Sequence, residues 1–407
     1  MPKRVLIPVT YPLGGIRTYL LYNLRQLCRN EGSIATRNDG SVATSNDGYQ
    51  FTFLSTAGEA FDLFKNDVAD WEGTEFVEVP EAKRGSYGMI QTIRRTLAQK
   101  EFALIHSQGL RAGTEAAVAN FFRQIPHLIT LHDVIVPGND LLGRFKRLKK
   151  FLIATATKRA TVIIPVSYDC AANHLEHFPA WRRGPVRIET ICNGVDVQRL
   201  LQSQRQFERD RQDGSVTLLR NEPGLSDDVV LGGFFGRFMP QKGFDILRDA
   251  LLLLAGQGLQ DRFCVLVTID RNGYTNETIR SVTNDPIVSK MVRLIEPVND
   301  IAPVMSQVDV LLMPSRWEAF SLLVEEAMVL GVPVIGSDCL GLREVLTQTP
   351  ASMPPKENPD ALASAIADFI KNREQKKKEA AQFALTAQRR FDVNIATEQL
   401  LTLYKRF

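Results

Sequence analysis

Two glutamates, Glu318 and Glu326, are separated by seven residues in a stretch that begins with Pro314-Ser315. A carboxylate accepts hydrogens from two hydroxyl groups at once, so such a pair suits a ligand that is rich in hydroxyls. On burial frequencies alone, two glutamates are more often solvated surface charges. The residues around them therefore decide between a binding pair and an exposed pair.

The residues between the two glutamates predict a loop that leads into a helix. An apolar strand is expected to end at Met313, and a helix with regularly spaced apolar residues is expected to follow the loop and to end near Gly331. The start of this helix presents the backbone amides of Phe320, Ser321 and Leu322. Free amides at a helix N-terminus are suited to binding a diphosphate.

A second set of candidate residues follows the apolar run at residues 230–235, which predicts a buried strand. The run leads directly into the turn Gly236-Arg237-Phe238-Met239-Pro240-Gln241-Lys242-Gly243. Arginine and lysine side chains can stabilise the charge that builds on a departing diphosphate. An exposed loop pair is the alternative for Arg237 and Lys242, but their place at the carboxyl end of a strand favours binding.

The first half of the chain offers candidates of lower specificity. Gly14 and Gly15 follow an apolar run at residues 4–9, and glycine permits close approach of the backbone to a ligand. Two adjacent glycines by themselves indicate only a turn. His132, followed by Asp133, ends a predicted strand at residues 127–131, although a single histidine is usually structural.

Taken together, these motifs resemble the retaining GT-B glycosyltransferases of the family 4 type, which include sucrose synthases and bacterial mannosyl- and glucosyltransferases. The resemblance spans nearly the whole chain and is strongest from Gly236 to Glu344. It departs from the family in the run Ser337-Asp338-Cys339-Leu340-Gly341, where Leu340 replaces the first glycine of the usual pair. The departure leaves the shape of this loop open.

The resemblance implies a role for each candidate residue. Arg237 and Lys242 would neutralise the donor phosphates, Glu318 would contact the donor sugar, and His132 would lie near that sugar, which makes these four the catalytic candidates. The donor-binding candidates are Gly14, Gly15, Gly236, Phe320, Ser321, Leu322 and Glu326, of which Glu326 would hold the ribose hydroxyls. No Asp-x-Asp sequence occurs in the chain. We therefore expect no metal ligands, no cofactor and a metal-independent reaction, with the nucleotide diphosphate sugar as a substrate.

Strands and helices alternate twice along the chain, which predicts two doubly wound α/β domains. In the GT-B fold that the resemblance implies, two Rossmann-like domains face each other across a cleft. The predicted domains are an acceptor-side domain at 1–200, a linker at 201–228, a nucleotide-sugar domain at 229–385 and a terminal helix at 386–407 that crosses back to the first domain. A tandem octapeptide at 33–48 predicts an inserted polar loop.

Composition narrows the class of protein. The chain has 407 residues and a net charge of only +3, so no nucleic-acid partner is expected. Its five cysteines are far apart, and no apolar stretch has the length of a membrane span. These features predict a cytoplasmic protein, with the inner face of the membrane as a further location.

A basic segment lies between Arg144 and Arg159, where Phe145, Leu148 and Phe151 alternate with lysines and arginines. The more common interpretation of such a segment is a solvated helix whose apolar side faces the core. The alternative is a helix that lies on an anionic membrane.

The expected function is that of a hexosyl- or related glycosyltransferase, which moves a sugar from a nucleotide diphosphate sugar to an unidentified hydroxyl acceptor with retention of configuration. Glycan, polysaccharide or glycolipid biosynthesis is the expected setting, and a glycan or a lipid-linked molecule is a candidate acceptor. Two alternatives stay open: a nucleotide-sugar epimerase, and a catalytically silent subunit that binds a glycan or another transferase.

Overall fold

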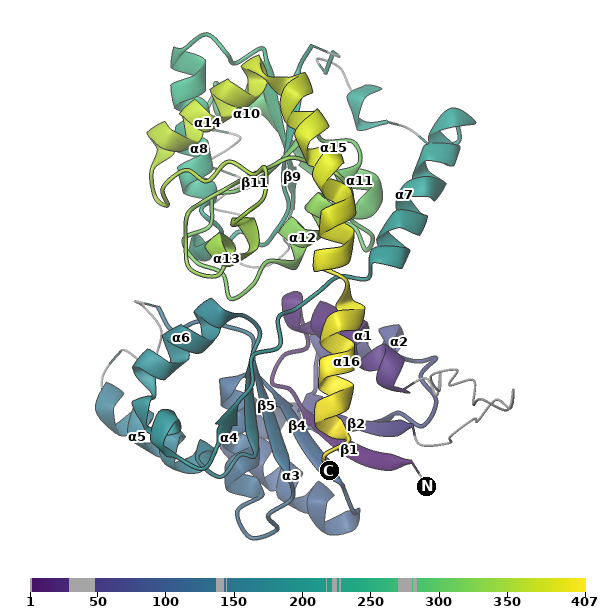
Figure 1. Cartoon of the computed structure of the whole chain (residues 1–407), viewed down its shortest axis with the longest axis vertical. Helices are drawn as coiled ribbons and strands as arrows, with labels where there is room; N and C mark the ends of the chain where they lie inside the picture. The colour runs from purple at the N-terminus through teal and green to yellow at the C-terminus, as the bar shows by residue number, and fades with distance from the viewer. Residues whose placement is uncertain are drawn as a thin grey trace. The chain divides into compact units, whose positions relative to one another are not determined.

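The structure is a computed structural model, and it describes residues 2–28, 48–136, 143, 145–216, 218–221, 225–226, 228–269, 280 and 284–407. The predicted polar loop at 33–48 lies outside the described residues apart from Gly48. The chain divides into two compact units (Figure 1). Unit 1 comprises Met1–Gly194 and Val393–Phe407, and unit 2 comprises Val195–Asp392.

The sheet of unit 1 has seven parallel strands in the order β3-β2-β1-β4-β5-β6-β7. The strands are β1 (Lys3–Pro8), β2 (Tyr49–Thr56), β3 (Glu75–Val79), β4 (Leu104–Gln108), β5 (His127–Leu131), β6 (Val162–Pro165) and β7 (Arg187–Ile188). Successive residues of β1 enter cores on opposite faces: Val5 and Ile7 pack on one side, and Leu6 packs on the other. Burial on both faces explains why the strands read as continuous apolar runs.

Helices cover both faces of this sheet. They are α1 (Gly15–Cys28), α2 (Glu59–Asp67), α3 (Ser86–Gln99), α4 (Leu110–Ala119), α5 (Lys146–Thr157), α6 (Tyr168–His177) and α16 (Val393–Tyr404). The core that contains Val5 also receives α1, α2 and α16, whereas α3 and α4 pack on the face of Leu6. The last helix, α16, lies beside α1 in unit 1 (Figure 1).

Unit 2 repeats the plan with five parallel strands in the order β10-β9-β8-β11-β12. The strands are β8 (Val230–Phe234), β9 (Phe263–Thr268), β10 (Val292–Ile295), β11 (Val310–Met313) and β12 (Val334–Gly336). The helices are α7 (Val197–Gln212), α8 (Phe244–Gly256), α10 (Val288–Met291), α11 (Ala302–Met305), α12 (Leu322–Val329), α13 (Leu342–Leu346), α14 (Pro359–Lys371) and α15 (Arg373–Arg390). Helices α8 and α14 pack together, as do α12 and α15.

Asp309 anchors the two central strands of unit 2 where they begin. Its buried carboxylate accepts hydrogen bonds from the Leu231 amide of β8 and from Arg220, and it also pairs with Arg373 and Lys377 of α15. Burial alone would raise the pKa of this carboxyl, but the Leu231 amide and the three cations outweigh burial and lower the pKa. The carboxylate therefore stays charged and ties β8, β11 and α15 together.

Both sheets reverse their direction of winding at a corresponding place. In unit 1 the reversal lies between β1 and β4, and in unit 2 it lies between β8 and β11. In open parallel sheets, ligands bind beyond the carboxyl ends of the strands at such a reversal, because the two loops there diverge to opposite faces. The glycine pair Gly14-Gly15 follows β1, and the two candidate loops of unit 2 follow β8 and β11.

The unit boundaries differ in detail from the predicted domains. Residues 201–228 were predicted to be a linker, but most of α7 lies in this segment and belongs to unit 2. The helix is highly polar and buries only Val197, Leu200 and Phe207, so its apolar face gives a weak signal in the sequence. The chain returns from unit 2 to unit 1 after Asp392, between α15 and α16.

The interpretation of the basic segment as a helix that turns its apolar side to the core is wrong. Helix α5 forms, but Phe145, Leu148, Phe151 and Leu152 are 56–65% exposed, and Thr157 is the one buried residue of the helix. The apolar side chains therefore face away from the core of unit 1.

Candidate functional site

Three loops meet at the carboxyl edge of the unit 2 sheet. The basic loop (235–243) follows β8, the glutamate loop (314–321) follows β11, and the leucine loop (337–341) follows β12. Backbone groups join them: the Arg316 amide donates to the Gln241 carbonyl over 2.8 Å, and the Glu318 amide donates to the Leu340 carbonyl over 2.9 Å. The glutamate loop is thus held on both sides.

Two glycines allow the backbones of these loops to approach closely. A Cβ atom on Gly243 would lie 2.0 Å from the Pro314 carbonyl oxygen, and one on Gly341 would lie 2.1 Å from the Glu318 carbonyl oxygen. Both glycines also have a positive φ, 68° and 77° respectively, which disfavours other residues. Any side chain at either position would have to push the glutamate loop away.

The carboxylate of Glu318 lies at the centre of the three loops. It accepts hydrogen bonds from the Lys242 ammonium over 2.8 Å and from the Ser315 hydroxyl over 2.7 Å. Glu318 is only 5% exposed, so a charged partner is needed to offset its desolvation. Lys242 and Glu318 are 76 positions apart in the sequence, and the structure shows them in direct contact.

Lys242 keeps part of its ammonium group available. Its side chain is 21% exposed, and its aliphatic stem passes Gly236, where a Cβ would lie 3.8 Å away. An ammonium group has three donors, so Lys242 can hold Glu318 and still meet an anion. Arg237 of the same loop is exposed, and among the described residues no ion pair involves its guanidinium group.

Arg316 fastens the glutamate loop from the outside. Its guanidinium donates two hydrogen bonds to Asp245 at the start of α8, and it also reaches Glu357 and the Pro240 carbonyl. These acidic partners, Asp245 first, raise the pKa of Arg316 above its already high usual value. The basic loop and the glutamate loop are thereby tied at a second place.

Helix α12 begins where the glutamate loop ends. Ser321 is its N-cap residue, and the amides of Leu322 and Leu323 have no hydrogen-bond acceptor among the described residues. Phe320 is half-buried, and Glu326 lies one turn into the helix and is 8% exposed. The free amides and the positive end of the helix dipole make this terminus receptive to an anion.

Glu325 is an acidic residue that sequence reasoning did not single out. It is fully buried, and neither of its carboxylate oxygens has a hydrogen-bond partner in the described part of the chain. Desolvation raises the pKa of Glu325 well above the usual range, and the charge of the neighbouring Glu326 adds to the rise. Burial therefore favours the neutral form of Glu325.

In unit 1, the loop after β1 has the open backbone expected of a binding turn. Gly14 has a φ of 58°, and a Cβ atom on Gly14 or Gly15 would meet nothing within 4 Å. The Gly14 carbonyl accepts from the Thr18 amide in the first turn of α1. Glycine is therefore needed at position 14 for its conformation, and the face of the loop is left uncovered within unit 1.

His132 follows β5 and is held by two side chains of unit 1. Its Nε2 atom is 2.8 Å from the Gln108 Oε1 atom, and the ring of Tyr19 meets it edge-on at a centroid distance of 4.6 Å. Burial lowers the pKa of His132 to about 3, so the ring is neutral at physiological pH. His132 can exchange hydrogen bonds with a ligand, but it offers no positive charge.

The structure thus joins some candidate residues and leaves others apart. Lys242 contacts Glu318 and lies beside Gly236, and Arg237 shares the basic loop with Lys242 and Gly236. Glu326 lies further along α12, and Gly14, Gly15 and His132 belong to unit 1. The sequence interpretation missed Ser315, Gln241, Arg316 and Gln108 as neighbours of the candidate residues. Ser315, Arg316 and Gln108 lie at or shortly after the carboxyl end of a strand, which was a usable signal, and Gln241 lies next to the candidate Lys242.

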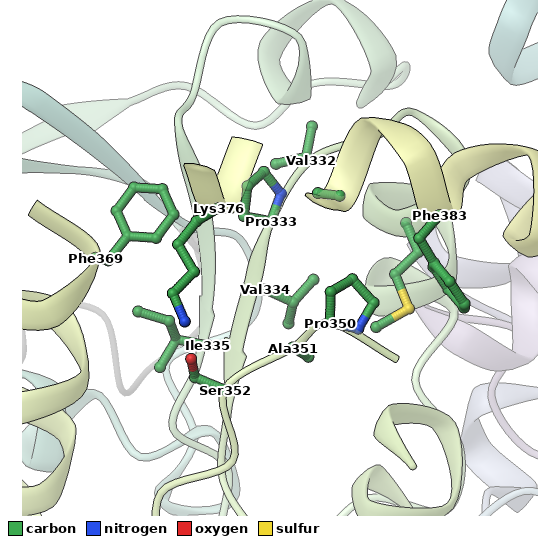
Figure 2. A pocket seen from close by; sticks show the side chains of 12 residues that line it. Val332, Pro333, Val334, Ile335, Pro350, Ala351, Ser352, Phe369, Lys376 and Phe383 are labelled. Atoms are coloured by element: carbon green, nitrogen blue, oxygen red, sulfur yellow. The ribbon is translucent and has the colours of Figure 1, made fainter. Parts of the chain in front are cut away.

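Metal-ligating side chains do not gather in the described part of the chain. No group of three or more histidines, cysteines, aspartates or glutamates there could hold a metal ion. A small cavity in unit 2 lies between β12 and α15 and is lined mainly by apolar side chains such as Val334 and Phe383 (Figure 2). Its volume of about 10 Å³ is room for roughly one water molecule, so it is a packing gap.

Comparisons with known proteins assign a family model to each unit. Residues 41–199 match the model described as Glycosyltransferase Family 4, and residues 230–372 match the model described as Glycosyl transferases group 1. Together the two matches span about three quarters of the chain.

Curated relatives are distant in sequence. The chain is 24% identical over 276 residues to the O-antigen biosynthesis glycosyltransferase WclY of Escherichia coli, which covers 67% of this chain and 71% of WclY. It is 23% identical over 344 residues to the D-inositol 3-phosphate glycosyltransferase of Corynebacterium glutamicum, which covers 82% of this chain and 79% of that protein.

Solved structures of similar fold include HepE of Anabaena in complex with UDP-glucose, with a TM-score of 0.74, 18% identity and 100% of both chains covered. Sucrose-phosphate synthase from Thermosynechococcus elongatus aligns with a TM-score of 0.73 and 16% identity over 99% of this chain and 98% of its own. At these identities the likeness shows the fold, which is the GT-B fold of two Rossmann-like domains.

The contact between Gly243 and the glutamate loop can be tested by Gly243→Ala. We expect a loss of roughly 2–4 kcal/mol in the free energy of unfolding, because the new methyl group meets a backbone oxygen and the positive φ is strained. Urea unfolding of the full chain, followed by circular dichroism, measures this loss.

Gly258→Ala is the matched control, because Gly258 has a φ of 76° but nothing within 4 Å of an added Cβ. It should cost only about 1 kcal/mol from backbone strain. Equal losses in the two variants would contradict a steric role for Gly243.

Proposed function

We propose that this chain, a glycosyltransferase of the GT-B, family 4 type, transfers a sugar from a nucleotide diphosphate sugar to a hydroxyl acceptor with retention of configuration. The observation that carries the proposal is the cluster of Lys242, Glu318 and the open N-terminus of α12 at the carboxyl edge of one sheet. The cluster combines a cation and free amides for a diphosphate with a carboxylate for hydroxyl groups.

A nucleotide donor is supported from two directions. HepE of Anabaena, which shares the fold, has been solved in complexes with UDP and with UDP-glucose. In this chain, the loop after β8 and the loop after β11 lie at the reversal point of the sheet, where parallel α/β sheets bind such ligands. The identity of the base and the sugar is left open by these features.

Charge development explains why the donor site needs these groups. When the bond between the sugar and the diphosphate breaks, negative charge builds on the leaving phosphate oxygens. Arg237, Lys242 and the first amides of α12 stabilise that charge, and Gly14 and Gly15 let backbone approach the phosphates from unit 1. The acceptor hydroxyl attacks from the face that the diphosphate leaves, and a phosphate oxygen takes its proton.

The remaining candidate residues orient the donor. Glu318 accepts hydrogens from sugar hydroxyls, and its contact with Lys242 sets its position relative to the phosphates. Glu326 holds the ribose hydroxyls, and His132 lies near the sugar. The precise placement of the reacting atoms contributes to the rate because it replaces random encounters with one productive geometry.

The reaction is proposed to need no divalent metal ion. Arginine, lysine and helix amides can neutralise a diphosphate in place of such an ion. Lys242 supplies a fixed cation whose position is set by the buried Glu318 carboxylate, and Arg237 supplies a second cation. The role of a metal is therefore assigned to side chains of the basic loop.

An acceptor at a membrane surface is supported by α5. Phe145, Leu148, Phe151 and Leu152 are exposed together with Lys146, Arg147 and Lys149, and no acidic residue occurs between 145 and 159. Figure 1 shows α5 at the outside of unit 1, where it packs beside α4. No helix in the described part of the chain is long and apolar enough to cross a membrane.

We propose that α5 lies at the surface of an anionic membrane at its inner face. Exposed phenylalanine and leucine side chains gain free energy by entering the headgroup boundary, and the neighbouring cations attract anionic lipid. The enzyme would then meet a lipid-linked acceptor in glycan or polysaccharide biosynthesis. This setting is supported by the similarity to WclY, which is described as an O-antigen biosynthesis glycosyltransferase.

A thermal-shift screen with EDTA present tests the donor proposal. We expect one class among UDP, GDP, ADP and dTDP, and its sugar conjugates, to raise the melting temperature, because a ligand that binds the native state stabilises it by mass action. Stabilisation that appears only after a divalent metal is added would contradict metal independence. If no nucleotide or conjugate stabilises the protein, the silent-subunit alternative gains support.

Replacing Lys242 tests the assignment of the phosphate cation. In Lys242→Ala we expect turnover to fall roughly 100- to 1,000-fold, the usual effect of removing one group that stabilises transition-state charge. Release of the nucleoside diphosphate from the donor selected by the screen measures it. Lys242→Met should behave similarly although it keeps the stem beside Gly236.

Lys290→Ala is the matched control, because Lys290 is exposed and precedes β10 at the other end of the sheet. Its turnover should stay close to that of the unchanged protein. Near-normal turnover of folded Lys242→Ala would contradict the assigned role.

Vesicle sedimentation tests the surface of α5. The protein should bind vesicles that contain phosphatidylglycerol more strongly than pure phosphatidylcholine vesicles, and the double variant Leu148→Ser/Phe151→Ser should weaken binding at least about tenfold through lost apolar burial. Lys146→Gln/Arg147→Gln should reduce the preference for anionic lipid, by about fivefold per charge at low salt. Leu385→Ser, on exposed Leu385 of α15, is the control. Equal binding to both vesicle types would exclude the proposed contact.

A further inference from the structure

A buried polar network in unit 1 ends on the imidazole of His132. Gln108 is the last residue of β4, is 2% exposed, and pairs in register with Thr130 of the neighbouring strand β5. His132 follows β5 by one residue, so the side chains of Gln108 and His132 meet at the carboxyl edge of the sheet.

The orientation of the Gln108 amide determines which nitrogen of His132 carries the hydrogen. The amide Nε2 group of Gln108 donates to the His106 carbonyl over 3.4 Å, which leaves its Oε1 oxygen facing His132 Nε2 at 2.8 Å. An amide oxygen only accepts hydrogen bonds, so the Nε2 atom of His132 must be the donor. In the neutral ring the Nδ1 atom then carries a lone pair, and among the described residues no hydrogen bond uses it.

The same network fixes the plane of the ring. Tyr19 of α1, which is 3% exposed, places its ring edge-on against His132. Thr130, the register partner of Gln108, contacts the Nε2 atom of His106 over 2.6 Å, and the other nitrogen of His106 lies 2.6 Å from the Tyr404 hydroxyl of α16. Side chains from α1 and β4 therefore contact the imidazole of His132 directly, and Gln108 joins it to the His106 backbone, whose side chain is held by Thr130 and Tyr404.

A neutral ring with its hydrogen on Nε2 is an acceptor toward a ligand. Protonation would convert Nδ1 into a donor and end that capacity, and burial opposes protonation because the charged form is poorly solvated. A support of this size is unnecessary for a histidine that only fills space. It is what a site requires when one lone pair must point in one direction.

We propose that Gln108 is a positioning residue that holds His132 in the Nε2–H tautomer, so that Nδ1 accepts the hydrogen of a hydroxyl group on the donor sugar. The sugar as ligand rests on the proposed function, whereas the tautomer and its dependence on Gln108 do not. Gln108 itself does not touch the substrate. It acts by removing the alternative in which Nδ1 would carry the hydrogen.

Nitrogen NMR of the ring tests the first half of the proposal without any substrate. In protein labelled with ¹⁵N-histidine, the His132 ring, assigned by its loss in His132→Asn, should show a protonated Nε2 and an unprotonated Nδ1 at neutral pH. In Gln108→Leu, which removes the acceptor, the ring should become a mixture of the two tautomers. A wild-type ring protonated at Nδ1, or an unchanged ring in Gln108→Leu, would overturn the proposal.

Kinetics with the donor selected by the nucleotide screen test the second half. In Gln108→Leu we expect kcat/KM to fall roughly 10- to 100-fold, the effect of leaving one hydrogen bond to a buried site unmade. Asn120→Leu is the matched control, because its buried amide contacts Ile125 before β5, at the other end of the sheet. A loss of similar size in Asn120→Leu would indicate general destabilisation and contradict a positioning role.

Gln108→Glu separates positioning from packing. The carboxylate keeps an acceptor against Nε2 and should preserve the tautomer, so kcat/KM should recover at high pH. Its negative charge raises the pKa of His132, and activity should then fall as the pH drops through the new pKa, because the protonated ring has no lone pair. The unchanged protein should lack this acidic limb. If Gln108→Glu is as slow as Gln108→Leu at every pH, the proposal fails.

These readings distinguish the inference from the proposed function. If no nucleotide sugar binds but the tautomer still depends on Gln108, the function is wrong and the positioning role stands. If the donor is turned over and the tautomer ignores Gln108, the function stands and the inference is wrong.

Discussion

The candidate donor site of unit 2 depends on the close passage of backbone past backbone at Gly243 and Gly341. At both positions a carbonyl of the glutamate loop occupies the space that a Cβ would need. This constraint brings the loops after β8, β11 and β12 within hydrogen-bonding range of one another. Without it, Lys242 and Glu318 would lie on separate loops and their contact would depend on two flexible side chains.

The ion pair of Lys242 and Glu318 follows from that packing, and it solves an electrostatic problem. A carboxylate as buried as Glu318 is costly unless it is paired, and a lysine alone at the edge of a sheet would be free to move. Each group fixes the position of the other, and the Ser315 hydroxyl donates a further hydrogen bond to the carboxylate. The ion pair itself therefore has no net charge, and the Lys242 side chain stays 21% exposed.

Much of this arrangement was accessible from the sequence, because the signals involved are local. Apolar runs predicted the strands, and the loops that follow them, which carry Arg237, Lys242 and His132, lie at the edge where parallel sheets bind ligands. The contact between Lys242 and Glu318 was not predictable as a contact, since it depends on the strand order and on two glycines in different loops. Gln108 was missed because a glutamine that ends a strand has no chemistry of its own; its significance arises from which ring it faces.

The two predictions that differ from the structure, for α7 and for α5, also have local causes. Helix α7 was taken for a linker because only three of its residues are buried, so composition outweighed a weak apolar period. For α5 the apolar period was recognised, but a period alone cannot say whether an apolar face turns inward or outward. That question is settled by the neighbours: α5 packs beside α4 and leaves Leu148 and Phe151 exposed.

The two units share a strand order, but the loops at the ends of their strands differ in charge. In unit 2 the loops at the reversal point carry Arg237, Lys242 and open helix amides, which suit the phosphates of a donor. In unit 1 the corresponding edge carries open glycines and an imidazole that burial keeps neutral, with an amide oxygen facing its Nε2 atom. A cation at His132 would have no lone pair with which to accept the hydrogen of a hydroxyl group. Separate tasks for charge and for hydrogen bonding therefore explain why one edge is built from cations and the other from a supported neutral ring.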